Sequence, residues 1–209
     1  MAPRAYDNHT RRQQQLVLKE SIAAVAAQLH ASQGVFDTSY AQIAERAGVA
    51  IPTVYKHFPS LDELVRGCTA HVVGQAPKFP AEHILSAPDL VSAVQRLVEA
   101  LDRLHAYFEP WVKWREQDRL PALAEMAAHR RVELTALCTA VLKRHGGPGA
   151  LRDAPSIWET LIHFECWQRL LREHQLSRPA VRRTLVHLLL AVAGPQPAAP
   201  PTPRPRPRK

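Results

Sequence analysis

The sequence has 209 residues, of which 46% are hydrophobic, and 27 Lys and Arg against 19 Asp and Glu give it a net charge of +8. This composition excludes a wholly disordered chain, and the length allows one large domain or two smaller ones. The positive charge favours an anionic partner without naming it, because nucleic acid, acidic membranes and phosphorylated ligands all attract Lys and Arg. The longest strongly apolar stretch, 185–193, is about half of the roughly 18 residues that suggest a membrane span.

The positive charge is unevenly distributed along the chain. Half of it lies in residues 204–209, which hold four basic residues and no acidic one. Seven prolines among the last fifteen residues predict an extended, polyproline-like segment. Two interpretations stay open for this tail: a solvated segment without a dedicated role, or a source of non-specific DNA affinity through Arg204, Arg206, Arg208 and Lys209.

The cysteines and the N-terminus indicate where the protein resides. Cys68, Cys138 and Cys166 stand far apart without a CxxC motif, which is typical of free thiols in a reducing compartment. The first thirty residues are amphipathic and interrupted by Arg11 and Arg12, so we expect no signal peptide. We therefore expect a cytoplasmic protein.

Helical periodicity dominates the chain, and no convincing period-two alternation is present. In the first segment, Leu18, Ile22, Val25 and Leu29 recur at helical spacing, and Gly34 ends the pattern. The prolines at 77, 80 and 88 break the pattern between two later segments. The sequence predicts an all-α fold of about nine helices, expected at residues 10–32, 38–47, 50–57, 60–74, 88–108, 110–114, 121–145, 155–174 and 178–194.

Two of these short segments, joined at Gly48, have the pattern of a helix-turn-helix. Gly48 can adopt the left-handed conformation that such a turn needs. A generic helical hairpin would show similar spacings, so this pattern alone leaves the two interpretations open. The expected contact between the helices joins Ile43, Ala44 and Ala47 to Val49, Val54 and Phe58, and it leaves Ile51, Thr53, Lys56 and His57 exposed for a DNA groove.

The wider stretch distinguishes these interpretations. It reads TSYAQIAERAGV at 38–49, IPTVYKHF at 51–58 and LDEL at 61–64, and over residues 10–65 it resembles the DNA-binding domain of the TetR family of transcriptional regulators. The resemblance implies phosphate contacts from Thr38, Ser39, Tyr55 and His57, base-edge contacts from Ile51, Pro52 and Thr53, and a place beside the DNA backbone for Lys56.

Three positions depart from the family's pattern. Ala50 stands where the family often has Ser, so the recognition helix is expected to lack its N-cap, at a cost of roughly 1 kcal/mol. Pro52 replaces a common Gly, which costs little in a first helical turn. Leu61 replaces a commonly basic residue, which removes one expected phosphate contact.

The expected domain order is a flexible N-terminal arm at 1–9, the helix-turn-helix domain at 10–58, a larger helical effector-binding and dimerisation domain at 59–194 and a disordered tail at 195–209. The last two helices carry apolar stripes that favour a four-helix interface in a homodimer. The alternative is that the last helix is buried inside one monomer. The expected interface residues are Ile157, Leu161, Phe164, Leu171, Val181, Leu185, Leu188 and Val192.

A small-molecule pocket is expected among the middle helices, where aromatic and polarizable side chains concentrate. The alternative is that most of these side chains are ordinary core residues. The candidate effector-binding residues are His105, Tyr107, Phe108, Trp111, Trp114, Met126, Trp158, His163 and Trp167.

Catalytic motifs are missing from the sequence. It contains no HExxH motif, no Gly-rich phosphate loop and no GxSxG elbow, so we expect no enzyme, no catalytic or metal site and no cofactor. Together with the resemblance, this predicts a homodimeric repressor that binds a palindromic operator in double-stranded DNA. An unknown small-molecule effector is expected to release it from the DNA, and no membrane partner is expected. The alternatives are a constitutive or architectural DNA-binding protein without effector and, more remotely, a helical enzyme or ligand carrier.

Overall fold

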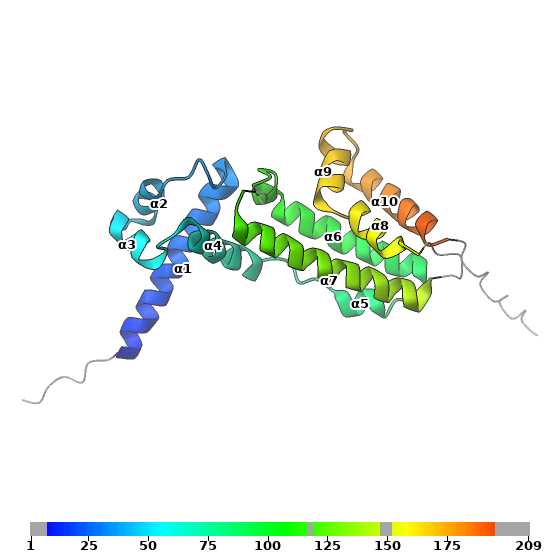
Figure 1. The fold of residues 1–209 in the computed structure, drawn as a ribbon, viewed down its shortest axis with the longest axis horizontal. Helices are drawn as coiled ribbons and strands as arrows, with labels where there is room; N and C mark the ends of the chain where they lie inside the picture. The colour runs from blue at the N-terminus through cyan, green and yellow to red at the C-terminus, as the bar shows by residue number, and fades with distance from the viewer. Residues whose placement is uncertain (1–7, 117–118, 147–151, 195–209) are drawn as a thin grey trace, which may run out of the picture. The chain divides into compact units, whose positions relative to one another are not determined.

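The computed structural model describes residues 8–116, 119–146 and 152–194, and all regular structure in these ranges is helical (Figure 1). The all-α prediction is confirmed, with ten helices in the described residues where about nine were expected. The expected tail at 195–209 and most of the expected arm at 1–9 lie outside the described residues. The helices are α1 (Asn8–Gln33), α2 (Tyr40–Ala47), α3 (Ile51–His57), α4 (Leu61–Gly74), α5 (Ala81–Leu85), α6 (Leu90–Val112), α7 (Pro121–His145), α8 (Ala154–Leu161), α9 (Phe164–Arg172) and α10 (Arg178–Val192).

The helices form two units. The first unit comprises residues 1–78 with 103–131, and the second comprises residues 79–102 with 132–209. Helices α6 and α7 therefore each contribute residues to both units. The first unit extends past the domain boundary expected after residue 58, because α4 packs on α1.

The core of the first unit forms along α1. Figure 1 shows α2, α3 and α4 beside the C-terminal half of α1, whose N-terminal turns project beyond them. Ile22 and Leu29 of the predicted stripe are buried there, together with Ala26 and the α4 residue Leu64. α1 ends at Gly34, whose φ of +87° lies in the left-handed region that favours glycine.

The C-terminal part of α6 is tied to the helices of this same unit. The Tyr107 hydroxyl donates to the carbonyl of Val72 in α4 at 2.8 Å, and the Trp111 indole N–H donates to the carbonyl of Ala27 in α1 at 2.7 Å. The prediction that Pro110 starts a separate segment is wrong, because α6 continues through it to Val112. Pro110 removes one hydrogen bond in the last turn, and the contacts of Tyr107 and Trp111 offset that loss.

Glu116, which follows α6, joins the loop after α1. Its carboxylate accepts hydrogen bonds from the N–H groups of Val35, at 2.9 and 3.0 Å, and of Phe36, at 3.2 Å. A Cβ at Gly34 would come within 2.9 Å of this carboxylate, so glycine is required there by both its φ and the available space. The ring of Phe36, in the same loop, has its centre 3.8 Å from the guanidinium of Arg119, which lies between α6 and α7.

A buried carboxylate organises the second unit. Asp102 of α6 is only 2% exposed, and it accepts a hydrogen bond at 2.9 Å from the indole N–H of Trp167 in α9. Arg178 of α10 donates to the same carboxylate at 2.8 and 3.2 Å, and Arg182 lies 3.8 Å away. Charge-assisted bonds of this kind compensate the desolvation of a buried acid, so Asp102 joins three helices.

Two further elements differ from the prediction. α5 was missed, since the prolines around it hide a short helix whose Ile84 is fully buried. The helix expected at 155–174 is instead two helices, because His163 adopts an extended conformation with ψ of 150°. The apolar spacing runs unbroken across this point, so periodicity alone could not reveal the break.

Among the residues that the structure describes, no helix combines the length and the apolar character needed to cross a membrane.

A buried histidine predicts how the stability of the first unit depends on pH. Burial lowers the pKa of His30 in α1 to about 4, from 6.5 in an unfolded chain. Between these values the unfolded chain binds a proton that the folded chain does not, so stability falls as the pH decreases from 6.5 towards 4. By linkage, we expect His30 to lower the free energy of unfolding by about 2 kcal/mol between pH 7.5 and pH 5.

Urea unfolding of the wild type and of His30→Gln at both pH values measures this contribution. The variant should lose about 2 kcal/mol less than the wild type over the same interval. Equal losses in the two proteins would contradict the assignment.

Candidate nucleic-acid interface

The turn between α2 and α3 has the geometry that the sequence predicts. Gly48 has a φ of +66°, and the Val49 N–H donates to the carbonyl of Ala44 at 2.9 Å. α2 itself begins with a reciprocal capping box, in which the Ser39 side chain accepts from the Gln42 N–H and the Gln42 side chain accepts from the Ser39 N–H. Local hydrogen bonds therefore define the entry of α2 and the turn that follows it.

Buried and aromatic contacts hold α3 on this support. Val54 and Phe58 are buried, as predicted, and the Tyr40 hydroxyl donates to the Phe58 carbonyl at 3.1 Å. The Tyr40 and Tyr55 rings stack with their centres 4.3 Å apart. The pKa of Tyr40 is raised, mainly by burial and then by the charge of the nearby Tyr55 side chain. The Tyr40 hydroxyl therefore stays protonated and can donate.

Packing against Phe58 requires a glycine at position 67 of α4, which the sequence alone did not reveal. A Cβ at Gly67 would lie 2.5 Å from Cε1 of Phe58, far closer than van der Waals contact allows. The Phe58 ring therefore occupies space that any other residue at position 67 would fill. A glycine inside an expected helix next to a helix-turn-helix was the available signal.

The outward face of α3 presents the residues that the resemblance implies. Ile51 is 44% and Tyr55 51% exposed, and Pro52 and Lys56 are exposed as well. Thr53 and His57, which were also expected to be exposed, are half-buried. Ile51 and Tyr55 are four residues apart on a helix, so their exposed side chains lie on the same side of α3. The structure thus leaves this face of α3 available to a ligand.

Thr38 and Ser39 are already engaged in local bonds. The Thr38 hydroxyl donates to the carbonyl of Gly34 at 2.7 Å, and Ser39 belongs to the capping box of α2. Both residues lie directly before α2, where backbone N–H groups and the positive end of the helix dipole favour an anion.

The start of α3 matches the departures seen in the sequence. Ala50 provides no side-chain cap, and Pro52 lies in the first turn, where its missing N–H is tolerated. By contrast, Ser60 caps α4 by accepting from the Glu63 N–H at 3.2 Å.

Lys19 is a cation beside α3 that sequence reasoning did not assign to the interface. Its Nζ lies 5.2 Å from the centre of the Phe58 ring. Partial burial, followed by the charges of Lys56 and Lys19, lowers the pKa of His57.

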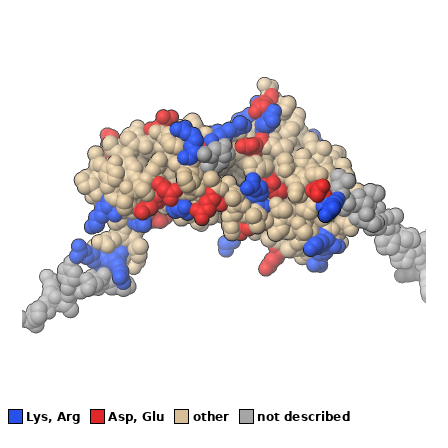
Figure 2. All heavy atoms as spheres, in the orientation of Figure 1, with Lys and Arg blue, Asp and Glu red and all other residues tan. Residues whose placement is uncertain are grey.

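Figure 2 shows Lys and Arg side chains along the projecting part of α1, and this part of the sequence holds Arg11 and Arg12. Positive side chains thus lie along the N-terminal part of α1, and Lys19 on the same helix lies close to the end of α3.

The nine candidate effector residues divide between the two units. In the first unit, Tyr107, Phe108 and Trp111 pack against the core of the helix-turn-helix. His105 is buried, Met126 is half-buried and Trp114 is exposed. In the second unit Trp158 and Trp167 are buried and His163 is exposed, and both indole N–H groups are bonded, to the Leu189 carbonyl and to Asp102.

The residues expected at a dimer interface do not share one outward face. Val181 and Leu185 are buried within their own chain, whereas Leu188 is 42% exposed. α10 therefore turns one side towards the core of its own chain and leaves another accessible. Of the remaining expected residues, Phe164 is buried and Ile157, Leu161, Leu171 and Val192 are half-buried.

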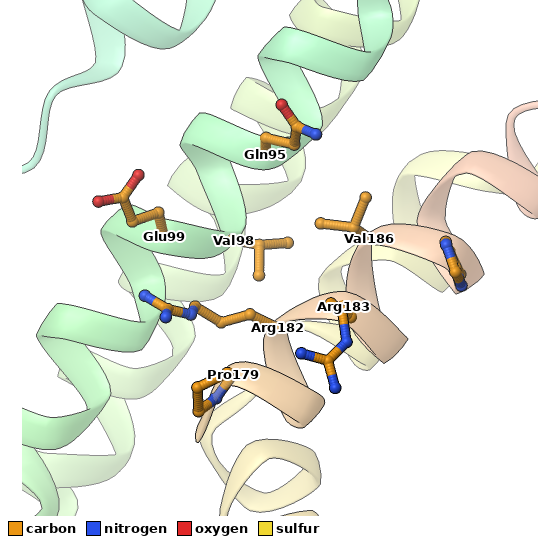
Figure 3. Close-up of a pocket in the computed structure, with 8 residues that line it drawn as sticks. Gln95, Val98, Glu99, Pro179, Arg182, Arg183 and Val186 are labelled. Carbon is orange, nitrogen blue, oxygen red and sulfur yellow. The ribbon is translucent and has the colours of Figure 1, made fainter. Parts of the chain in front are cut away.

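A surface groove of about 420 Å³ lies in the second unit between α6 and α10 (Figure 3). Val98 and Val186 point towards one another across it, and the Arg182 side chain extends towards Glu99. None of the nine candidate effector residues lines this groove, whose walls are formed by Gln95, Val98, Glu99, Pro179, Arg182, Arg183, Val186 and His187.

Residues 22–68 match the model of the bacterial regulatory proteins of the TetR family. This match covers the C-terminal part of α1, the capped α2, the turn at Gly48, α3 and the beginning of α4. The N-terminal part of this chain is a TetR-family helix-turn-helix domain. The resemblance inferred from the sequence is thereby confirmed.

Other proteins share parts of the sequence or the fold of this chain. It is 26% identical over 105 residues to the HTH-type transcriptional regulator LuxR of Vibrio harveyi, and the match spans 48% of this chain and about half, 51%, of that regulator. The structure of NalD, the secondary repressor of the MexAB-OprM multidrug efflux pump in Pseudomonas aeruginosa, aligns with a TM-score of 0.64 at 21% identity, over 86% of this chain and 97% of NalD. The multidrug binding protein EbrR, solved with imidazole, aligns with a TM-score of 0.57 at 22% identity, over 95% of this chain and all of EbrR. At these identities, the two structures show a shared fold.

The tight contact at Gly67 provides a test of how α3 is held. Gly67→Ala should lower the free energy of unfolding by about 1–3 kcal/mol, because the added methyl group displaces the buried Phe58 ring. Gly74→Ala is the matched control on the same helix, since a Cβ there meets nothing within 4 Å and should be neutral or slightly stabilising. Thermal unfolding of both variants measures the difference, and a Gly67→Ala variant as stable as the wild type would refute the contact.

Proposed function

We propose that the protein is a transcriptional repressor that binds a palindromic operator as a homodimer and leaves it when a small-molecule effector binds. The observation that carries this proposal is the outward face of α3, where Ile51 and Tyr55 are exposed on a helix whose opposite side is anchored by buried Val54 and Phe58. In a helix-turn-helix, the second helix enters the major groove with such a face.

The exposed face divides between base and phosphate contacts. Ile51, Pro52 and Thr53 lie at the N-terminal end of α3, the end that reaches base edges in a helix-turn-helix. Tyr55, Lys56 and His57 follow and contact phosphates, with Lys19 of α1 adding a further cation. The N–H groups before α2, next to Thr38 and Ser39, bind another phosphate.

A homodimer supplies the second half-site of a palindrome. The accessible side of α10, with exposed Leu188 and half-buried Val192, is the surface that pairs with a second copy, together with half-buried Leu161 and Leu171. Val181 and Leu185 support this surface from the core.

Release from DNA acts through α6. This helix has residues in both units, and its C-terminal part is bonded to α4 through Tyr107 and to α1 through Trp111. An effector that binds better to one position of α6 shifts the population of α4 positions, and hence the spacing of the two recognition helices.

The proposal is tested by selecting bound fragments from genomic DNA with the purified protein. A palindromic sequence with two half-sites is expected, and fragments without a common sequence would contradict the proposal. Small molecules are then screened for release of the protein from the selected operator. A complete absence of release would favour the alternative, a constitutive or architectural DNA-binding protein.

Charge removal beside α3 should weaken operator binding. A plot of log affinity against log salt has a negative slope. Lys56→Ala and Lys19→Ala should each make this slope less steep by about one, because each variant loses one phosphate contact. Lys78→Ala, an exposed lysine of the same unit, is the control and should leave the slope unchanged. Anisotropy titrations from low to high salt measure the slope, and unchanged slopes in both test variants would contradict this DNA-binding surface.

His57 should make operator affinity depend on pH. Its pKa is lowered in the free protein, and a phosphate beside it would favour the protonated form and raise that pKa. Binding then takes up a proton, so affinity should fall as the pH rises from 5.5 to 8. His57→Gln should flatten this dependence in anisotropy titrations, and an equally steep dependence in the variant would show that another group titrates.

A further inference from the structure

The loop between α1 and α2 is held by an acid from a distant part of the chain. Oε1 of Glu116, which follows α6, accepts from the N–H groups of Val35 at 2.9 Å and of Phe36 at 3.2 Å, and Oε2 accepts from Val35 at 3.0 Å. Hydrogen bonds from backbone N–H groups to a carboxylate are stronger than bonds between neutral groups. One side chain therefore determines where this loop lies.

The bonds of Glu116 continue towards the start of α2. The Thr38 hydroxyl donates to the carbonyl of Gly34 at 2.7 Å, and the Thr38 N–H donates to the carbonyl of Val35 at 3.2 Å. Ser39, the next residue, caps α2. The position of this cap thus depends on the loop that Glu116 holds.

The first turn of α2 keeps two backbone donors available. The N–H groups of Ser39 and Gln42 are used in the capping box, whereas those of Tyr40 and Ala41 have no hydrogen-bond partner among the described residues. Free N–H groups at a helix N-terminus bind anions, and the helix dipole adds to the attraction. These donors lie beside Thr38 and Ser39, where the proposed function places an operator phosphate.

The part of the chain that carries Glu116 is itself anchored in the first unit. Leu120 and Ala122, at the start of α7, are buried in one cluster with Val35. The Ala122 N–H also donates to the Asp62 carboxylate of α4 at 3.1 Å. Packed residues thus follow Glu116 closely and limit the positions that its carboxylate can take.

We propose that Glu116 is a positioning residue of the DNA-binding surface: it holds the start of α2 so that the Tyr40 and Ala41 N–H groups bind one operator phosphate. This inference rests on the function proposed above and adds to its phosphate site a residue from outside the helix-turn-helix. Without Glu116, the loop samples other conformations and only a fraction of the molecules present both N–H groups correctly. The apparent affinity for DNA falls by that fraction.

Two substitutions of Glu116 test the role of its oxygen. Glu116→Ala should bind the selected operator about tenfold more weakly than the wild type, because the bonds to a charged acceptor are lost. Glu116→Gln should stay within about twofold of the wild type, because Oε1 already accepts from both N–H groups and one amide oxygen can replace it. Anisotropy titrations measure both affinities, after a stoichiometric titration has counted the molecules able to bind.

Glu82→Ala, which removes an exposed acid from α5, is the control for charge. Removal of an acid makes the protein more positive and does not weaken DNA binding by itself, so this variant should bind at least as well as the wild type. Wild-type affinity in Glu116→Ala, or a Glu116→Gln variant as weak as Glu116→Ala, would overturn the proposal.

Uncharged methylphosphonates in the operator separate positioning from a general loss of stability. Each phosphate is replaced in turn. At one phosphate of each half-site, the replacement should weaken the wild type about tenfold and Glu116→Ala by less than about twofold, because the variant has already lost that contact. A variant that is merely less stable would lose the same factor as the wild type at every phosphate, and this result would overturn the proposal.

Hydrogen exchange without DNA distinguishes the failure of this inference from the failure of the proposed function. The Val35 and Phe36 amides should exchange about tenfold faster in Glu116→Ala than in the wild type, and unchanged exchange would refute the hold on the loop. A protein that selects an operator and binds it equally well with Glu116→Ala refutes the positioning role alone. A protein that selects no operator refutes the regulator and this role with it, and faster exchange then assigns Glu116 to the loop only.

Discussion

The contact between Phe58 and Gly67 is the constraint on which the DNA-binding surface depends. Phe58 lies where α3 ends, its ring fills the space left by the missing side chain of Gly67, and its carbonyl accepts from Tyr40. The position of α3 is thereby determined by α2 and α4 together. The ring also lies under Lys19, so the same residue links the recognition helix to the positive charge on α1. A helix of seven residues has little stability of its own, and these contacts supply what it lacks.

The helices that carry this surface are connected to the rest of the chain by a few polar bonds. Tyr107, Trp111 and Glu116 reach α4, α1 and the loop before α2, and each donates to or accepts from a backbone group. A backbone N–H or carbonyl group moves with its helix, so each of these bonds depends on where the whole helix lies. A shift of α6 would therefore change the positions of α1 and α4 directly, as the proposed release from DNA requires.

The sequence allowed much of the helix-turn-helix to be predicted, but it left open what the aromatic residues of the later helices do. The helix-turn-helix could be predicted because its signals are local: a glycine at the turn and buried positions at helical spacing. Tryptophans, in contrast, suit a core and a pocket equally well. Trp111 and Trp167 proved to be bonded to Ala27 and Asp102, contacts that join residues more than sixty positions apart.

By itself, the sequence determined the all-α class, the helix-turn-helix and the exposure of Ile51 and Lys56 on α3, since each follows from periodicity or from residue preferences within a few positions. Only the tertiary structure decided that the helix expected at 155–174 breaks at His163 and that α6 passes through Pro110. It alone also showed that donors surround the Asp102 carboxylate, whereas Oε1 of Glu159 has no hydrogen-bond partner among the described residues. The physical reason is that a buried polar group is satisfied by whichever donors the packing of distant helices brings to it, and the spacing of residues along the chain does not contain that information.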